Sequence, residues 1–231
     1  IGKSRFVVVA PHAGGDDLKT GIVAIMLADK LNAFNIVNKN YFKPINRRAK
    51  RDSEHVEDFN KLRWSKKNQC YLWKGKNPVM KEFFDDIIDY SNQARGYSEE
   101  KKAVAIYIHG IKNKKIGIDL GVGLKSLKGK NKFTYSAEDL SPNSGLITIK
   151  FSQLKKIKSI LQKSLELDYN LSVSVGKKFI GWSKQSAVQF HKNEGRGDYA
   201  IQLEINRFLR KDENLNYLID LLVDALEQTF K

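Results

Sequence analysis

The chain of 231 residues carries 41 Lys and Arg against 26 Asp and Glu, a formal net charge of +15, and 41% of its residues are hydrophobic. That composition excludes an intrinsically disordered protein, and the single cysteine, Cys70, excludes both a disulfide framework and a cysteine-built zinc site. No apolar run approaches the roughly 20 residues of a membrane helix, so we expect no membrane partner.

The first half of the chain alternates predicted strands and helices. Residues 6–10 (FVVVA) form a continuous apolar run that is typical of a buried strand, and helical spacing follows from Thr20 to about Phe34. Ile36 and Val37 indicate a second strand. Residues 38–77 are polar and show no assignable pattern, which in a compact domain usually marks a functional segment. Pro78 then suits the first turn of a helix. The apolar face of that helix is Met80, Phe83, Phe84, Ile87 and Ile88.

The second half continues the alternation. Apolar runs predict strands at residues 103–108, 146–151, 171–175, 187–190 and 199–205. Ser152 is a candidate cap for a helix that contains Leu154 to Leu165, and Leu215 to Leu226 mark a C-terminal helix. Strands that alternate with helices predict a single α/β domain over residues 1–231, with a mixed, mostly parallel sheet flanked by helices.

Two histidines follow two of the apolar strands directly. His12 comes after residues 6–10 and His109 after residues 103–108, and ligands of open α/β sheets bind beyond the carboxyl ends of the strands. Together with Asp17 or Asp16, the two imidazoles would form a zinc-binding set of two histidines and one carboxylate. The Gly14-Gly15 pair allows the tight turn that this needs. A lone histidine beside a turn is more often an ordinary hydrogen-bonded residue, and two glycines can also bind an anion.

A third candidate lies in the strand at residues 199–205. Alternate residues divide between two faces: Tyr199, Ile201, Leu203 and Ile205 on one, and Ala200, Gln202 and Glu204 on the other. Glu204 is a carboxylate in an otherwise apolar strand, where burial would raise its pKa towards the range of a general base. The alternative is a buried glutamate that is paired with Arg207 or Arg210.

Three segments, PHAGGDDLKTG (residues 11–21), YIHG (107–110) and AIQLEINRFLR (200–210), together resemble the N-formylglutamate amidohydrolase family and its relatives, the phage-type poly-γ-glutamate hydrolases. The resemblance spans most of the chain and rests on the order of the three segments. It implies a zinc-carboxypeptidase-like, phosphorylase/hydrolase-like fold and a Zn²⁺ cofactor.

The resemblance also implies roles for single residues. The zinc ligands would be His12, Asp17 and His109, and Glu204 would be the general base and acid. Many relatives have glutamate where Asp17 stands, so Asp17 is a departure and Asp16 stays a candidate.

The segment HVEDFN, residues 55–60, is similar to the family's Asp-x-Asn-Arg substrate signature. This makes Asn60 a candidate substrate contact, although Lys61 stands where arginine is usual. An arginine is well suited to hold a substrate carboxylate through two hydrogen bonds. The candidates for that role are Arg47, Arg48, Arg63 and Arg207.

The resemblance predicts a zinc-dependent hydrolase that cleaves an amide bond in a carboxylate-bearing substrate, either a small N-formylglutamate-like molecule or a γ-glutamyl polymer. Zinc lowers the pKa of bound water from 15.7 to about 7, and Glu204 would take the proton of that water and pass it to the leaving nitrogen. A metal-free relative that binds without cleaving is one alternative.

The positive charge favours another alternative, a non-catalytic basic α/β domain that binds nucleic acid or another polyanion. The aromatic and basic residues near Arg63, Trp64 and residues 71–73 would suit base stacking, or they could simply pack against the sheet. The charge is spread along the chain and no nucleic-acid-binding motif is present, so nucleic acid is the less expected partner. We expect a cytoplasmic protein, and export stays open because the chain begins at Ile1 rather than at a methionine.

Overall fold

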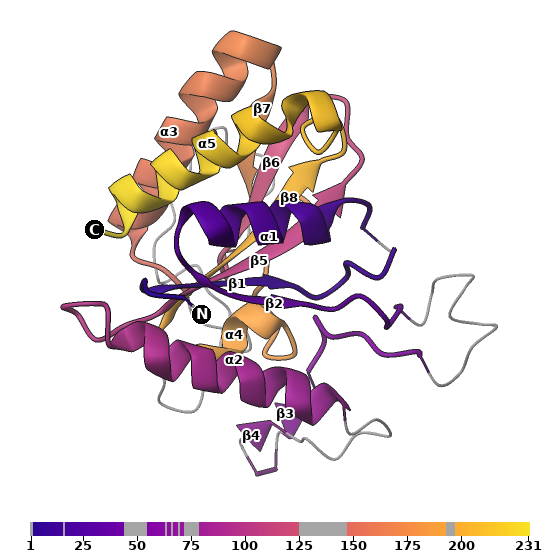
Figure 1. Ribbon diagram of the computed structural model, residues 1–231, viewed down its shortest axis with the longest axis vertical. Coiled ribbons are helices and arrows are strands. Elements are labelled where there is room, and N and C mark those ends of the chain that lie inside the picture. Colours follow the sequence, from indigo (N-terminus) through magenta and orange to yellow (C-terminus); the bar gives the residue numbers. More distant parts are fainter. Residues whose placement is uncertain are drawn as a thin grey trace.

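A six-stranded sheet with the strand order β2-β1-β5-β8-β6-β7 forms the centre of the computed structural model (Figure 1). The structure describes residues 2–15, 17–43, 55–62, 64–65, 67–68, 70–71, 79–124, 147–192 and 197–231. The strands of the sheet are β1 (Phe6–Ala10), β2 (Phe34–Val37), β5 (Val104–Ile111), β6 (Ile116–Gly121), β7 (Ser172–Val175) and β8 (Tyr199–Asn206). The two short strands β3 (Trp64–Ser65) and β4 (Cys70–Tyr71) pair separately.

The sheet is mixed, with a parallel majority. Strands β2, β1, β5 and β8 are parallel to their neighbours, whereas β6 runs antiparallel to β8 and β7 runs parallel to β6. This confirms the predicted α/β fold with a mixed, mostly parallel sheet. Parallel strands are buried on both faces, which is why β1 and the first part of β5 read as continuous apolar runs in the sequence.

Helices cover both faces of the sheet (Figure 1). The helices α1 (Thr20–Lys30), α3 (Phe151–Tyr169) and α5 (Asp212–Thr229) lie on one face and share the larger hydrophobic core. The helices α2 (Val79–Arg95) and α4 (Ala187–Phe190) lie on the other face and form a second core with Val7, Val9 and Tyr107.

The alternation of side chains along β8 is the predicted one. Tyr199, Ile201, Leu203 and Ile205 belong to the larger core, and Ala200 belongs to the core under α2 and α4. On this second face the sheet becomes polar towards the ends of its parallel strands, because Tyr107 is followed by His109 in β5, and Ala200 by Gln202 and Glu204 in β8. The second face therefore carries polar groups where the two strands end.

Two predicted strands are wrong, and one strand of the six-stranded sheet was missed. The short strands β3 and β4 also lie in residues 38–77, where no element was predicted. Residues 187–190 form the short helix α4, because a four-residue apolar run is too short for its period to be read. Residues 147–150 are irregular and Phe151 already begins α3, where Lys150 is the N-cap and its backbone N–H donates to the side chain of Gln153 at 2.8 Å. Ser152 lies inside that helix. Strand β6 (IGIDLG) was missed because two glycines and an aspartate interrupt its apolar pattern.

The predicted first helix is also shorter than expected, since α1 ends at Lys30 and Asn32 adopts a left-handed conformation with φ of 50°. Pro78 lies outside the described residues, while the predicted apolar face of α2 is largely buried. None of the helices among the described residues is long and apolar enough to cross a membrane.

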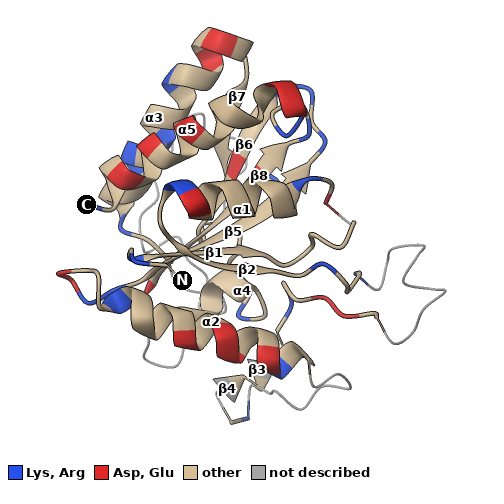
Figure 2. Cartoon of the chain, in the orientation of Figure 1, with Lys and Arg blue, Asp and Glu red and all other residues tan. Residues whose placement is uncertain are grey.

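The net positive charge of the chain is not shared evenly by the helices. Helix α5 contains five Asp and Glu and neither Lys nor Arg, whereas α3 carries Lys155, Lys156, Lys158 and Lys163. Figure 2 shows acidic residues along α2 and α5 as well. The described helices thus do not form one continuous basic face.

Candidate metal centre

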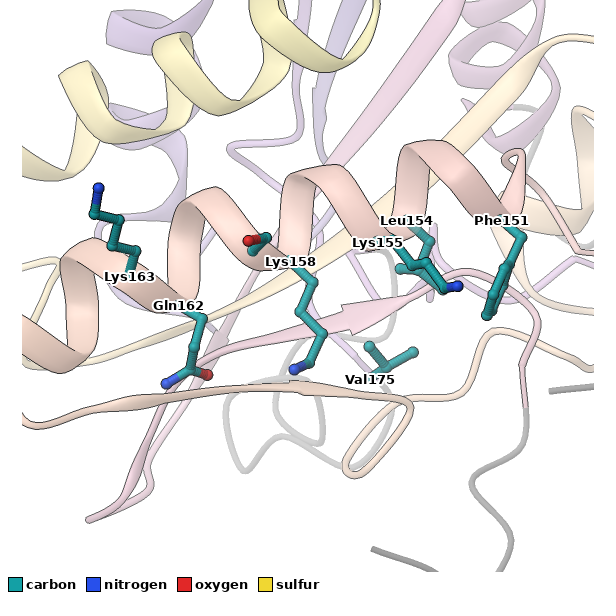
Figure 3. Close-up of a pocket in the computed structure, with 8 residues that line it drawn as sticks. Phe151, Leu154, Lys155, Lys158, Gln162, Lys163 and Val175 are labelled. Carbon is teal, nitrogen blue, oxygen red and sulfur yellow. The ribbon is translucent and has the colours of Figure 1, made fainter. Parts of the chain in front are cut away.

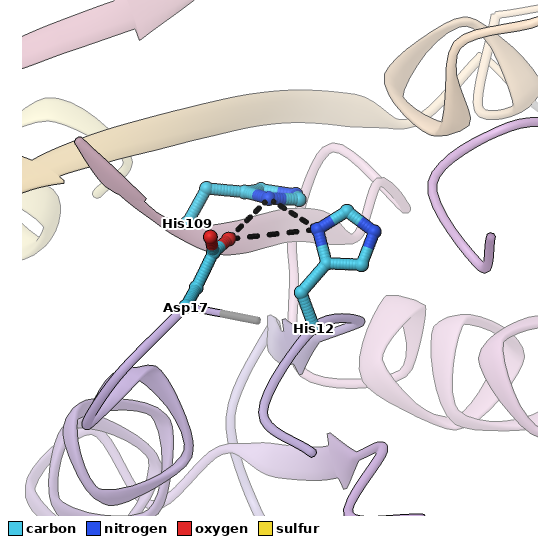
Figure 4. A group of neighbouring side chains, drawn as sticks. All are labelled: His12, Asp17 and His109. Atoms are coloured by element: carbon cyan, nitrogen blue, oxygen red, sulfur yellow. Dashed lines mark hydrogen bonds and ion pairs between the residues drawn. The ribbon is translucent and has the colours of Figure 1, made fainter. Parts of the chain in front are cut away.

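His12, Asp17 and His109 meet at the edge of the sheet where β1 and β5 end (Figure 4). His12 follows β1 by two residues, and His109 lies near the end of β5, the neighbouring parallel strand. The Nδ1 atoms of the two histidines are 3.0 Å apart. Oδ2 of Asp17 lies 3.3 Å from Nδ1 of His109 and 3.5 Å from Nδ1 of His12. The three side chains therefore turn one ligand atom each towards a common point, and the group could hold a metal ion.

The turn after β1 carries Asp17 back to His12. Gly15 has a φ of 119°, a conformation that favours glycine, and a Cβ atom at Gly14 would lie 2.9 Å from the carbonyl oxygen of Lys39. The backbone N–H of Asp17 donates to the carbonyl of His12 at 3.2 Å, which closes the turn. The tight turn expected from the two glycines is therefore present. Asp16, the alternative ligand, lies outside the described residues.

The second nitrogen of His12 is held by a carboxylate. Nε2 of His12 lies 2.9 Å from Oδ1 of Asp58. Because a carboxylate only accepts hydrogen bonds, Nε2 donates, and once the ring is neutral the lone pair of Nδ1 faces Asp17 and His109. Oδ1 of Asp58 also accepts from the backbone N–H of Asn60 at 3.1 Å. A carboxylate behind a ligating histidine is common in metal sites, where it sets the orientation of the ring.

Two of the three residues carry the charge that a metal ligand needs at neutral pH: His109 is neutral and Asp17 is ionised. Burial lowers the pKa of His109 to about 4, so this imidazole is neutral at neutral pH. Burial alone would raise the pKa of the Asp17 carboxyl, but hydrogen bonds from His109 and His12 outweigh it and hold this pKa well below its usual range. Burial also opposes the charged form of His12, yet its contacts with Asp17 and Asp58 raise its pKa. A metal ion would therefore displace a proton from His12.

Glu204 lies next to this group in the sheet. In β8 it pairs with His109 of β5 on one side and with Asp119 of β6 on the other. Burial raises the pKa of Glu204 to about 7. The hydrogen bond from Gln202 lowers this pKa, whereas the charges of Asp17 and Asp119 raise it further. Nε2 of Gln202 donates to Oε1 of Glu204 at 2.7 Å. A carboxyl group that titrates near neutral pH can both accept and donate a proton.

A cavity of about 330 Å³ opens over these residues. Its lining includes the two histidines together with Asp58, Asn60, Gln202 and Glu204. Lys43 and Lys61 also line it and supply positive charge, and Nζ of Lys43 is 3.7 Å from Oδ1 of Asp17. The cavity thus combines a possible metal site, a carboxyl group with a raised pKa and two ammonium groups.

The structure brings one of the expected substrate contacts into the cavity. Asn60 lines it, and Nδ2 of Asn60 donates to Oε1 of Gln202 at 3.2 Å. Arg207 is exposed and is not among the lining residues. The other expected arginines, Arg47, Arg48 and Arg63, lie outside the described residues.

None of the arginines in the described part of the chain forms an ion pair with Glu204. Arg210 is buried beside Gly110, but its Nε donates to the carbonyl of Ile205 at 3.1 Å. Glu204 accepts its hydrogen bond from Gln202 instead. The described residues therefore do not form the alternative that the sequence left open, a buried ion pair between Glu204 and Arg207 or Arg210.

Sequence reasoning missed Asp58 and Asp119. Asp58 stands within HVEDFN, two residues before Asn60, and that segment was its only signal. Asp119 is fully buried in β6 and accepts hydrogen bonds from the backbone N–H groups of Lys177 (3.1 Å), Lys178 (2.6 Å) and Phe179 (3.1 Å). Ser174 donates to it as well, at 2.6 Å. These hydrogen bonds hold residues 177–179 in place against β6. The ring of Phe179 in turn stacks on the ring of His109, with the ring centroids 6.4 Å apart.

A larger hollow of about 620 Å³ lies between α3 and β7 (Figure 3). Its lining consists of apolar residues such as Leu154 and Val175, of Ser159 and Gln162, and of Lys155, Lys158 and Lys163. No carboxylate, imidazole or thiol is among these lining residues. They therefore provide neither a metal-binding set nor an acid–base pair, and the cavity over Glu204 is the better candidate for chemistry.

Comparisons with known proteins support the fold alone. No protein-family model matches the chain, and no curated protein does. Among solved structures, the crystal structure of gene product Atu2144 from Agrobacterium tumefaciens is similar to this chain, with a TM-score of 0.55 and 12% sequence identity. The similarity covers 99% of this chain and 90% of the other. At that identity it extends to the arrangement of helices and strands and not to an activity.

Proposed function

We propose that the protein is a zinc-dependent hydrolase that cleaves an amide bond in a carboxylate-bearing substrate. The observation that carries the proposal is the position of Glu204, whose pKa is about 7, next to His109 of the His12–Asp17–His109 group. Catalytic zinc sites use three protein ligands of this kind and leave one position open.

The spacing of the three ligand atoms fits a small metal ion such as zinc. Tetrahedral zinc with bonds of about 2.0–2.1 Å places neighbouring ligand atoms about 3.3 Å apart. The distances within the group are 3.0, 3.3 and 3.5 Å. The carboxylate of Asp58 behind His12 supports the same assignment, because it turns Nδ1 of His12 towards the other two ligand atoms.

The residues that line the cavity have distinct roles in the proposed reaction. Zinc, when bound, would supply a Lewis acid that polarises the amide carbonyl and acidifies water. Glu204 takes a proton from the attacking water and delivers it to the leaving nitrogen, for which a pKa near 7 is suitable at neutral pH. Gln202 holds Oε1 of Glu204 in place. Lys43 and Lys61 attract the carboxylate of the substrate into the cavity.

The resemblance of three segments to the N-formylglutamate amidohydrolase family agrees with this chemistry, and we propose membership of that family or of its γ-glutamyl-hydrolysing relatives. The alternative of a basic domain that binds nucleic acid has less support. Tyr71, an expected stacking residue, is buried against the ring of Phe190, and α5 carries no basic residue. Neither observation suits a nucleic-acid surface.

The proposal is tested by loading the protein with zinc and screening N-formylglutamate, other N-acylglutamates and short γ-glutamyl peptides for release of a free amine. We expect hydrolysis of at least one of these compounds, and we expect Glu204→Gln to lower kcat by about 100-fold or more while zinc stays bound. Glu82→Gln on the outer surface of α2 serves as a matched control and should leave the rate unchanged. Equal rates for the wild type and Glu204→Gln would contradict the role of Glu204, and no hydrolysis of any compound would contradict the reaction.

A further inference from the structure

The hollow between α3 and β7 shares no lining residue with the cavity over Glu204. It lies at an edge of the six-stranded sheet, because β7 is the end strand of the sheet order. Its volume of about 620 Å³ falls within the range of roughly 300–1,000 Å³ that is usual for small-molecule sites. The hollow is therefore large enough to hold a ligand of its own.

The floor of the hollow is apolar and firmly held. Oε1 of Gln162 accepts a hydrogen bond from the backbone N–H of Val173 at 2.7 Å, which ties α3 to β7. Towards the first turn of α3 the hollow is lined by the almost fully buried side chains of Leu154 and Val175, and Phe151 stands beside them (Figure 3). A ligand would gain most of its affinity here by placing an apolar part against this floor.

Lysines project from the α3 wall of the hollow. Lys155 and Lys158 are three residues apart on the helix, so their side chains lie on the same face. Figure 3 shows the ammonium group of Lys158 on the side of β7, and Nζ of Lys155 lies 4.6 Å from the centroid of the Phe151 ring. Lys163 lines the hollow farther along the helix. The described lining includes no Asp or Glu, and α3 has none before Glu166, so this wall is positively charged.

Positive and apolar groups are thus separated within the hollow. The cations belong to α3, whereas β7 contributes only the apolar Val175 to the lining. A purely apolar ligand would cover the lysines without offering them a counter-ion, which is unfavourable. A small inorganic anion would leave the apolar floor in water. A molecule that has an apolar body and one anionic group complements both parts.

We propose that the hollow between α3 and β7 binds a small amphipathic anion, whose phosphate or carboxylate group pairs with Lys155 and Lys158 and whose apolar chain covers the floor. This site is separate from the candidate metal centre, and the inference does not depend on the proposed hydrolysis.

The test uses probes that separate the two parts of such a ligand. Dodecyl phosphate has both parts, dodecyl trimethylammonium has the same chain with a positive head group, and inorganic phosphate has no chain. Each is titrated calorimetrically into the purified protein, with the two dodecyl compounds kept below their critical micelle concentrations. Dodecanoate, titrated in the same way, shows whether the site prefers a carboxylate to a phosphate. Octyl phosphate, which is four methylene groups shorter, measures the contribution of the chain.

We expect about one dodecyl phosphate per chain, bound at least about tenfold more tightly than dodecyl trimethylammonium, inorganic phosphate or octyl phosphate. No binding of dodecyl phosphate, or equal affinity for dodecyl trimethylammonium, would overturn the inference.

Charge-reversal variants locate the site. Lys155→Glu and Lys158→Glu should each weaken the binding of dodecyl phosphate by about tenfold or more. Lys3→Glu makes the same change at an exposed residue near β2, at the opposite edge of the sheet, and should change the affinity by less than about twofold. The thermal midpoint of each variant shows that it is folded. Unchanged affinity in both Lys155→Glu and Lys158→Glu, or an equal loss in Lys3→Glu, would mean that the hollow is not the binding site.

The result is independent of the proposed function. Neither α3 nor β7 contributes a residue to the lining of the cavity over Glu204, so zinc content and amide hydrolysis should be the same in Lys155→Glu as in the wild type. Binding of dodecyl phosphate by a protein without hydrolase activity would leave this inference standing and count against the hydrolase alone.

Discussion

His109 and Glu204 lie side by side in the sheet, as in-register partners on the neighbouring parallel strands β5 and β8. A possible metal ligand and a possible general base are thus held by backbone pairing on two rigid elements rather than by loops. The central position of both strands makes this arrangement resistant to displacement, because each has a further strand on its other side. The catalytic proposal depends on this adjacency. The loops contribute His12 and Asp17, which complete the metal-binding group, and Asp58, which contacts His12.

The first prediction concerns metal content. We expect about one zinc ion per chain in protein that has never met a chelator, and loss of that ion in His12→Ala and in His109→Ala, because each variant leaves only two of the three ligands. Elemental analysis of the purified proteins measures this. His55→Ala removes a histidine from outside the group and should keep its zinc. Zinc retained in both His12→Ala and His109→Ala would place the metal elsewhere.

The second prediction concerns Asp58. Asp58→Asn weakens the acceptor that turns Nδ1 of His12 towards the metal, so zinc affinity should fall by about 10- to 100-fold. Competition with a chromogenic chelator measures this affinity. Asp89→Asn, on the exposed face of α2, makes the same chemical change away from the site and should have no effect. An unchanged affinity in Asp58→Asn would mean that Asp58 does not orient His12.

The strands β1 and β5 could be located from the sequence because buried parallel strands are continuously apolar. His12 and His109 were found as histidines that follow these two apolar runs, although β5 itself continues to Ile111. Glu204 was found as a carboxylate within an apolar strand. Asp58 could not be found, since it reaches His12 across 46 residues from a segment without regular structure. Asp119 was hidden for a different reason: its strand is interrupted by Gly117 and Gly121, so no apolar run marked it as part of the sheet.

The third prediction concerns Glu204 and the stability of the metal-free protein at different pH values. Its pKa in the folded state is about 7, above the ordinary value of 4.5, so the folded state holds a proton that the unfolded state has released between these two values. Stability therefore falls as the pH rises through this range, by at most about 3 kcal/mol.

Glu204→Gln removes this titration and keeps an oxygen that Gln202 can bond. The variant should be more stable than the wild type at pH 8 and similar to it at pH 5, although we expect it to be inactive. Urea unfolding of both proteins at the two pH values measures the difference. A difference in stability that is the same at pH 5 and pH 8 would show that Glu204 titrates normally.

The last prediction concerns Asp119, whose carboxylate accepts three backbone N–H groups and the hydroxyl of Ser174. Asp119→Ala removes the buried carboxylate that accepts all four hydrogen bonds, and we expect a loss of about 3 kcal/mol or more in the free energy of unfolding, measured in urea. Ser174→Ala removes one of the four donors and should cost only about 1 kcal/mol. Because the same bonds fix the segment of Phe179, the stacking of its ring on His109 should loosen in Asp119→Ala, and zinc affinity should fall with it. A variant as stable as the wild type would show that this carboxylate does not anchor the segment.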